Sequence, residues 1–315
     1  MRVVDRILRL PELEAAPPVL VDVGAAKGIH PKWRRIAKYA VCVAFEADER
    51  ELASVTNESS DFRRLTTVNR IAAERASETE RFHLTASPYC SSRLTPLHVY
   101  LRRYAFAPLF EVERTVELPA VDLRSSFESL GLERIDWLKL DSQGTDLRLF
   151  KSVGELADDV LVVELEPGII DAYEGEDRLV DVLAEFDGRG FWVSGLEVAG
   201  STRIDSEFAR RELGTRAASL IDACHKRAPG WVEIEYFNDF ADDQRFGKRE
   251  LLLGCAFAFL RGHDAFALEL ASRGLERFGS PFDDLRQTAL RRVRRHFARL
   301  PAAALKALPR RLLGH

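Results

Sequence analysis

The sequence predicts an α/β protein with a mostly parallel, Rossmann-like sheet and a C-terminal helical appendage. Two short apolar runs, VLVDVG at 19–24 and VCVAFE at 41–46, are typical of strands buried on both faces. A helix predicted at 31–39 lies between them with Pro31 at its first position, so the three segments form a strand–helix–strand unit with parallel strands. Beyond Arg245 the pattern changes to three consecutive helices.

Apolar periodicity, together with the glycine and proline positions, predicts the remaining elements in chain order. Strands are expected at 65–71, 79–85, 115–123, 135–141, 160–167, 191–198 and 232–237. Helices are expected at 3–10, 48–55, 125–130, 145–153, 177–186, 207–224, 248–261, 265–278 and 283–300. The chain is therefore expected to divide into an α/β domain at 1–245 and a helical appendage with a basic tail at 246–315.

The composition indicates a globular protein of a reducing compartment. Hydrophobic residues make up 46% of the chain and charged residues 30%, which is ordinary for a folded domain. The four cysteines are far apart and form no CxxC pair, which argues against a structural zinc site and a secreted disulfide framework. No signal peptide is visible, and the longest apolar run, at 251–260, is half the length of a bilayer span. We expect a cytoplasmic protein.

Charge is concentrated at the C-terminal end. The net charge is −4, but residues 286–315 carry +9 and the rest of the chain −13. Leu290, Val293, Phe297 and Leu300 would share one face of a helix there. This pattern suits a peripheral contact with anionic lipid. An arginine face packed on the acidic body suits it equally, and nucleic acid is not expected as a partner.

A glycine-containing loop follows the first predicted strand. Asp22 ends the strand, and the loop runs through Gly24, Ala25 and Gly28, where glycines let the backbone turn tightly beside a ligand. Glu46 ends the second strand 22 positions after Gly24, a spacing that suits a carboxylate bound to ribose hydroxyls. Neither GxGxxG nor GxxxxGK[ST] is present. The alternative is a turn that only packs a helix against a strand.

Carboxylates end two later strands. Asp141 is followed by a glycine turn into a helix, at the sheet edge where α/β proteins bind ligands. Glu164 and Glu166 lie two residues apart on the next strand and are expected to share a face. Each has a structural alternative: Asp141 as a helix cap, and Glu164 as the partner of a buried Lys or Arg.

In their order along the chain these segments resemble the FkbM-type methyltransferase family. VDVGAAKG (21–28) resembles its D-x-G-A-N-x-G loop, FEAD (45–48) its F-E-P segment, and FHLTASPYCSSRL (82–94) its serine-pair segment. IDWLKLDSQGTDLRLFKS (135–152) resembles its I-D-x-x-K-x-D-x-E/Q-G signature, and VVELEP closes the series. Two positions depart from the pattern, since Ala26 replaces the usual Asn and Gln143 replaces a frequent Glu.

The resemblance implies a class I methyltransferase fold that uses S-adenosylmethionine (SAM). Asp22, Gly24, Ala25, Gly28 and Glu46 are then expected to bind the cofactor. Asp141 is expected at the reacting centre with Glu164 near it, and the acceptor to be a hydroxyl of a sugar, a glycan or a related small molecule. A divalent metal is compatible with aligned carboxylates but is not required.

The segment at 87–103 is the expected place of acceptor contacts. Tyr89, Ser91, Ser92 and Arg93 could bind a hydroxylated ligand. His98 is an alternative general base, against the interpretation that it is a solvated surface residue.

Two other functions stay open from the sequence. An NAD-dependent oxidoreductase could use a similar fold, although the missing GxGxxG counts against it. A catalytically silent SAM-binding or scaffold protein is the third hypothesis, because of the departures at Ala26 and Gln143. The oligomeric state cannot be read from the sequence.

Overall fold

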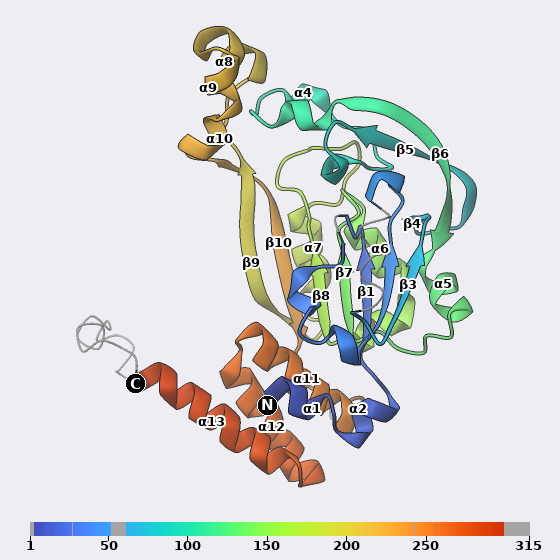
Figure 1. The fold of residues 1–315 in the computed structure, drawn as a ribbon, viewed down its shortest axis with the longest axis vertical. Helices are drawn as coiled ribbons and strands as arrows, with labels where there is room; N and C mark the ends of the chain where they lie inside the picture. The colour runs from blue at the N-terminus through green and yellow to red at the C-terminus, as the bar shows by residue number, and fades with distance from the viewer. Residues whose placement is uncertain (1–2, 27, 52–60, 243, 299–315) are drawn as a thin grey trace. The chain divides into compact units, whose positions relative to one another are not determined.

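The computed structural model describes residues 3–26, 28–51, 61–242 and 244–298 (Figure 1). The chain folds into two compact units, one spanning Pro18–Ala241 and the other combining Met1–Pro17 with Asp242–His315.

The larger unit contains a seven-stranded sheet with the order β3-β2-β1-β7-β8-β10-β9. The strands are β1 (Val19–Val23), β2 (Val41–Phe45), β3 (Arg64–Val68), β7 (Trp137–Leu140), β8 (Val162–Leu165), β9 (Phe191–Ser201) and β10 (Ala228–Asn238). β10 pairs antiparallel with β8 and β9, and all the other pairings are parallel. The predicted mostly parallel sheet is confirmed.

The centre of the sheet is buried, as its apolar runs predict. All residues of β1, β2 and β8 are buried. Helices α5 (Leu123–Ser129), α6 (Asp146–Ser152) and α7 (Leu179–Phe186) each bury a phenylalanine in the core: Phe127, Phe150 and Phe186. The Phe186 ring stacks on Tyr236 of β10, with 4.0 Å between ring centroids.

A second, three-stranded sheet has the order β4-β6-β5. It consists of β4 (Ile71–Ala73), β5 (Ser77–Thr85) and β6 (Val112–Asp122), and α4 (His98–Leu101) lies in the connection between β5 and β6. Figure 1 shows β5 and β6 as a long, curved ribbon with α4 at one end. The strand expected at 65–71 therefore ends early, at Val68, and the chain continues into a different sheet.

Two predicted helices differ from the structure. The segment at 31–39 forms two 3-10 turns, Pro31–Trp33 and Ala37–Tyr39, whose backbone hydrogen bonds join residues three positions apart, such as the Ile36 N–H to the Trp33 carbonyl. The segment at 207–224 is divided into α8 (Ser206–Leu213), α9 (Thr215–Ser219) and α10 (Ile221–Cys224). The first break is at Gly214, whose φ of 79° no helix allows. Most of the helix expected at 48–55 falls on 52–60, outside the described residues.

The smaller unit is helical. It contains α1 (Val3–Ile7), α2 (Pro11–Ala15), α11 (Lys248–Arg261), α12 (Asp264–Phe278) and α13 (Phe282–Ala298). Residues 1–17 are expected in the α/β domain from the sequence, whereas the structure groups them with the C-terminal helices. Helices α1 and α2 pack against α11 with the apolar side chains of Ile7 and Leu13 buried, and the guanidinium of Arg249 donates to the carbonyls of Ala16 and Pro17 at 2.9 and 3.1 Å.

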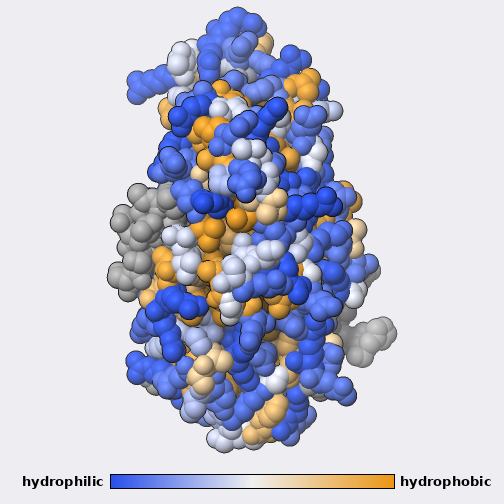
Figure 2. Space-filling view, turned by 90° about the vertical axis from the view of Figure 1, so that its right-hand side faces the viewer, coloured by the Kyte–Doolittle hydropathy of each residue, from blue (hydrophilic) through white to orange (hydrophobic). Residues whose placement is uncertain are grey.

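In the part of the chain that the structure describes, no helix is long and apolar enough to cross a membrane. The basic residues beyond 298 lie outside the described residues. Figure 2 shows a mainly hydrophilic face on which hydrophobic side chains emerge in places.

Candidate active site

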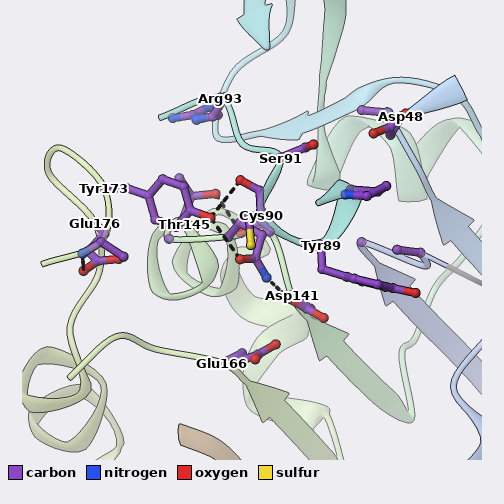
Figure 3. Close-up of a pocket in the computed structure, with 18 of the residues that line it drawn as sticks. Asp48, Tyr89, Cys90, Ser91, Arg93, Asp141, Thr145, Glu166, Tyr173 and Glu176 are labelled. Carbon is purple, nitrogen blue, oxygen red and sulfur yellow. Dashed lines mark hydrogen bonds between the residues drawn. The ribbon is translucent and has the colours of Figure 1, made fainter. Parts of the chain in front are cut away.

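A cavity of about 390 Å³ opens where β1, β2, β7 and β8 end. Val23, Glu46, Asp141 and Glu166, at or just past the carboxyl ends of these four strands, contribute to its lining. This is the sheet edge at which open α/β proteins bind ligands. Figure 3 shows the carboxylates of Asp141 and Glu166, which come from neighbouring strands, at this cavity.

The turn after β1 requires glycine. Gly24 has φ of 79°, and a Cβ built there would lie 2.0 Å from the carbonyl oxygen of Asp141. Its N–H donates to the carbonyl of Phe45 at 3.0 Å, and Gly28 donates to Ala25 at 3.1 Å. The turn is thereby fixed against β2 and β7, and Gly24 lines the cavity, whereas Ala25 and Gly28 do not.

Asp22 lies beneath the turn, outside the cavity lining, and is fully buried. Its carboxylate is 3.2 Å from Lys139 Nζ and accepts a hydrogen bond from the His30 N–H at 3.3 Å. Lys139 also lies 3.4 Å from Asp141 Oδ2. Burial opposes protonation of Lys139, but Asp22, Asp141 and Glu164 raise its pKa above the ordinary value. Asp22 therefore holds a cation beside Asp141.

Glu46 lines the cavity at the end of β2. Its Oε1 accepts the Asp48 N–H at 2.7 Å, and among the described residues Oε2 has no hydrogen-bond partner. Burial raises the pKa of Glu46 to about 7. When it is ionised, the Glu46 carboxylate can accept hydrogen bonds from a ligand inside the cavity.

Asp48, which also lines the cavity, is held by Arg50. The guanidinium donates to Asp48 Oδ2 at 2.6 Å and to Ser91 Oγ at 3.1 Å. Ser91 thus connects the segment that follows β5 to the loop that follows β2.

Asp141 and Glu166 form a carboxyl pair at the centre of the lining. Burial, and after it the charge of the neighbouring Asp141, raise the pKa of Glu166 well above its ordinary value. The neutral form of Glu166 is therefore favoured beside the Asp141 carboxylate, because two adjacent charges are costly in a buried site. Gln143 Nε2 donates to Asp141 Oδ1 at 2.7 Å and fixes its orientation.

Both the backbone and the side chain of Gln143 are hydrogen-bonded to neighbouring residues. Its φ of 57° is unusual for a residue other than glycine and costs about 1–3 kcal/mol. The Ser92 hydroxyl donates to its backbone carbonyl at 2.7 Å. The Tyr173 hydroxyl lies 3.1 Å from Gln143 Oε1 and 2.9 Å from the Cys90 carbonyl. Ser92 therefore supports Gln143 without lining the cavity.

Two residues proposed for catalysis lie away from the cavity. Glu164 Oε1 accepts the Trp137 Nε1–H at 2.6 Å, and its Oε2 forms an ion pair with Lys32. Both carboxylate oxygens are therefore bound by protein groups. The His98 side chain is about half exposed (48%) on α4, 3.7 Å from Glu111. Neither lines the cavity.

Of the residues expected to bind the acceptor, Tyr89, Ser91 and Arg93 line the cavity. Arg93 is paired with Glu74 at 2.7 Å.

Several lining residues were missed by the sequence analysis: Glu166 as a site residue, Tyr173, Glu176 and Trp231. Glu166 follows the end of β8 as Asp141 follows the end of β7, and this signal could have identified it. Glu164 and Glu166 were expected to share a face, but β8 ends at Leu165, so strand alternation does not extend to Glu166.

No group of three or more His, Cys, Asp or Glu side chains among the described residues could hold a metal ion.

Comparisons with known proteins identify the family. Residues 22–191, more than half of the chain, match the methyltransferase FkbM domain. A comparison with curated proteins gives no match. Among solved structures, the chain is similar to magnesium protoporphyrin IX methyltransferase from Synechocystis PCC 6803 with bound SAM, at 10% identity and a TM-score of 0.32, with 75% of this chain and 76% of that chain covered.

A TehB-like SAM-dependent methyltransferase from Corynebacterium glutamicum is similar at 9% identity and a TM-score of 0.30, with 76% of this chain and 88% of that chain covered. The domain match confirms the resemblance found in the sequence: this chain belongs to the FkbM methyltransferase family.

Proposed function

We propose that this FkbM methyltransferase transfers the methyl group of SAM to a hydroxyl oxygen of a small-molecule acceptor, such as a sugar, a glycan or a related compound. One observation carries the proposal: a single cavity joins Glu46 at the end of β2 to the Asp141–Glu166 pair at the ends of β7 and β8. β1 separates β2 from β7, so the two carboxylate sites leave the sheet about 9–10 Å apart.

The residues at the β1–β2 end fit the nucleoside of SAM. Gly24 has no side chain at the point where the backbone must approach both a ligand and Asp141. The Oε2 of Glu46, which has no partner in the described part of the chain, can accept a hydrogen bond from a ribose hydroxyl. Ile71, Ala72 and Phe82 add apolar lining suited to a base.

SAM, when bound, supplies an electrophilic methyl group on a sulfonium. The residues of this chain orient the acceptor and receive its proton. The hydroxyl oxygen forms a bond to the methyl group while the sulfur–methyl bond breaks and S-adenosylhomocysteine leaves, and its proton can pass to the ionised member of the Asp141–Glu166 pair. Lys139 stabilises the negative charge on Asp141 from 3.4 Å. Alignment of reactants can supply about 7–11 kcal/mol, and a general base about 10²–10⁴-fold in rate.

Calorimetric titration with SAM and with S-adenosylhomocysteine tests the cofactor. We expect both to bind, and binding of neither would contradict the proposal. A thermal-shift comparison of SAM with NADH separates it from the oxidoreductase hypothesis.

Isotope-labelled SAM and a panel of alcohols test the reaction itself. We expect the labelled methyl group to be found in an ether by mass spectrometry. Cofactor binding without transfer to any member of a broad panel would favour a silent SAM-binding protein.

We further propose that the arginine-rich C-terminal end makes a peripheral contact with anionic lipids on the cytoplasmic face of a membrane. Phe297 on α13 is 66% exposed among basic residues, as such a contact requires. Flotation with phosphatidylglycerol and with phosphatidylcholine liposomes compares the full chain with a chain ending at 285, which lacks Phe297 and the basic tail. We expect only the full chain to float strongly, and only with the anionic lipid. Equal flotation of both chains would contradict a contact through the tail.

A further inference from the structure

Four aromatic side chains, Phe106, Phe110, Tyr173 and Trp231, line the cavity together, and we call them the aromatic wall. Phe106 stacks on Trp231 with 6.0 Å between ring centroids and planes 7° apart. Phe106 and Phe110 meet edge to face at 5.0 Å, and Phe110 lies 5.6 Å from Tyr173. These are favourable aromatic geometries, so the wall is a preformed apolar surface.

The wall is held by contacts between segments that are distant in sequence. The Phe106 N–H donates to Ser201 Oγ at the end of β9 at 3.0 Å. The Tyr173 hydroxyl lies 2.9 Å from the Cys90 carbonyl, and Gly168 forms a β-bridge with Trp231. Because its backbone segments are tied in this way, the wall does not need a ligand in order to form.

The charged groups at this end of the cavity are acidic. Glu166 and Glu176 line it, and burial raises the pKa of Glu176 to about 7. Among the described lining residues the arginines are Arg70 and Arg93, which come from the loop after β3 and the segment after β5, and Arg93 is paired with Glu74. A phosphate or carboxylate on the acceptor would therefore meet the carboxyl groups of Glu166 and Glu176 at the wall, while the charge of Arg93 is already engaged by Glu74.

The wall and the carboxyl pair line the same cavity and can therefore contact one ligand. Trp231 is on β10, and Asp141 follows β7, with β8 between these two strands. The two strands are therefore about 9–10 Å apart across the sheet, and Trp231, opposite Gly168, lies beyond the carboxyl end of β8.

We propose that the acceptor is an uncharged alcohol with an apolar ring system, which lies on the aromatic wall while its hydroxyl faces Asp141 and Glu166. The inference rests on the proposed methyl transfer and narrows its acceptor class. A ring alcohol or a glycoside with an apolar aglycone fits, whereas a free polyol or a phosphorylated compound does not.

Calorimetry on the full chain, with and without S-adenosylhomocysteine, tests this with three probes: naphthalene-2-methanol, the anionic naphthalene-2-carboxylate and myo-inositol. We expect the neutral naphthalene alcohol to bind at least about tenfold more tightly than either of the others. Failure of the alcohol to bind, or equal binding of the carboxylate or of inositol, would overturn the proposal.

Three variants test whether naphthalene-2-methanol binds at the aromatic wall. Trp231→Ala should weaken binding of naphthalene-2-methanol about tenfold or more, since it removes a ring from the wall. Ala172→Phe keeps the wall and fills the cavity beside it, and should also block the probe. Phe208→Ala removes an exposed ring on α8 outside the cavity and should change nothing. Unchanged affinity in both cavity variants would overturn the proposal.

The titration with S-adenosylhomocysteine separates this inference from the proposed function. Each variant should bind that ligand within about twofold of the parent chain, which also shows that it is folded. If the parent chain binds the naphthalene alcohol but not S-adenosylhomocysteine, the proposed methyl transfer fails and the apolar site stands. If the parent chain binds S-adenosylhomocysteine but not the naphthalene alcohol, only the proposed acceptor class is contradicted.

Discussion

At the scale of single residues, the carboxylates at the sheet edge fall into two groups: some line the cavity, and others are bound by protein donors outside its lining. Asp141, Glu166 and Glu46 line the cavity, whereas Asp22 and Glu164 are occupied by protein donors. Residue type and position at a strand end are the same in both groups. The two groups differ in the hydrogen-bond partners of each carboxylate. Substitution in the first group should therefore affect ligand binding or turnover, and substitution in the second should affect stability.

The raised pKa of Glu46 predicts a pH dependence of SAM binding. At pH values below about 7 the group is protonated, and it becomes an ionised acceptor for ribose hydroxyls as the pH rises. SAM affinity should therefore increase between about pH 6 and 8 and level off above that range. Calorimetry across this range checks the increase. Glu46→Gln should bind weakly at every pH, and a variant that kept the parent slope would show that another group titrates.

Exchange of Asp141 for asparagine should remove turnover and keep the cofactor. Asp141→Asn has nearly the same shape but cannot take a proton, so the rate of methyl transfer should fall about 10²–10⁴-fold. SAM affinity, measured by calorimetry, should stay within a few-fold.

Glu164→Gln is the matched control, because Glu164 pairs with Lys32 and Trp137 outside the cavity. It should lose about 1–3 kcal/mol of unfolding free energy and keep most of its turnover. The opposite pattern in the two variants would mean that Glu164 is the reacting group.

At the scale of elements, the turn after β1 connects three strands. Gly24 donates to Phe45 at the end of β2 and is in contact with the backbone of Asp141 after β7. The cofactor end and the reacting end of the cavity therefore share one backbone contact.

A methyl group at Gly24 should separate these strands. In Gly24→Ala the Cβ would lie 2.0 Å from the Asp141 carbonyl oxygen, which is far inside van der Waals contact. We expect loss of SAM binding and a lower melting temperature. Gly131→Ala is the matched control: its φ is 66°, and a Cβ there has nothing within 4 Å. It should lose about 1–2 kcal/mol of stability from backbone strain and keep SAM binding. If Gly24→Ala and Gly131→Ala lost the same stability and both kept SAM binding, backbone strain alone, and not the contact with Asp141, would explain the effect of Gly24→Ala.

At the scale of the whole molecule, the chain begins and ends in the same helical unit. Residues 1–17 join α11–α13, and the α/β unit is the intervening segment 18–241. Arg249 on α11 is buried and bonds to the carbonyls of Ala16 and Pro17.

Removal of this link should destabilise the helical unit. Arg249→Met leaves two carbonyl groups without their donor and should cost about 1–3 kcal/mol in unfolding free energy. Arg291→Met is the control, since Arg291 is exposed on α13 and donates to Thr288 at 3.0 Å. Denaturant unfolding measures both, and equal stability of the two variants would contradict the role of Arg249.

The sequence by itself determined the strands, the glycine turn and two of the site carboxylates. Buried strands read as apolar runs, and Gly24, Glu46 and Asp141 stand directly at their ends, so local pattern is enough to position them. The family motifs lie in the same local segments, and the match over 22–191 confirms them.

The tertiary structure decided which neighbouring side chain lines the cavity. Glu166 and not Glu164 does so, because Trp137 and Lys32 occupy Glu164. The aromatic wall combines Phe106 with Trp231, which are 125 positions apart in the chain. Contacts over such separations depend on strand order and crossovers, and no local pattern of residues encodes them.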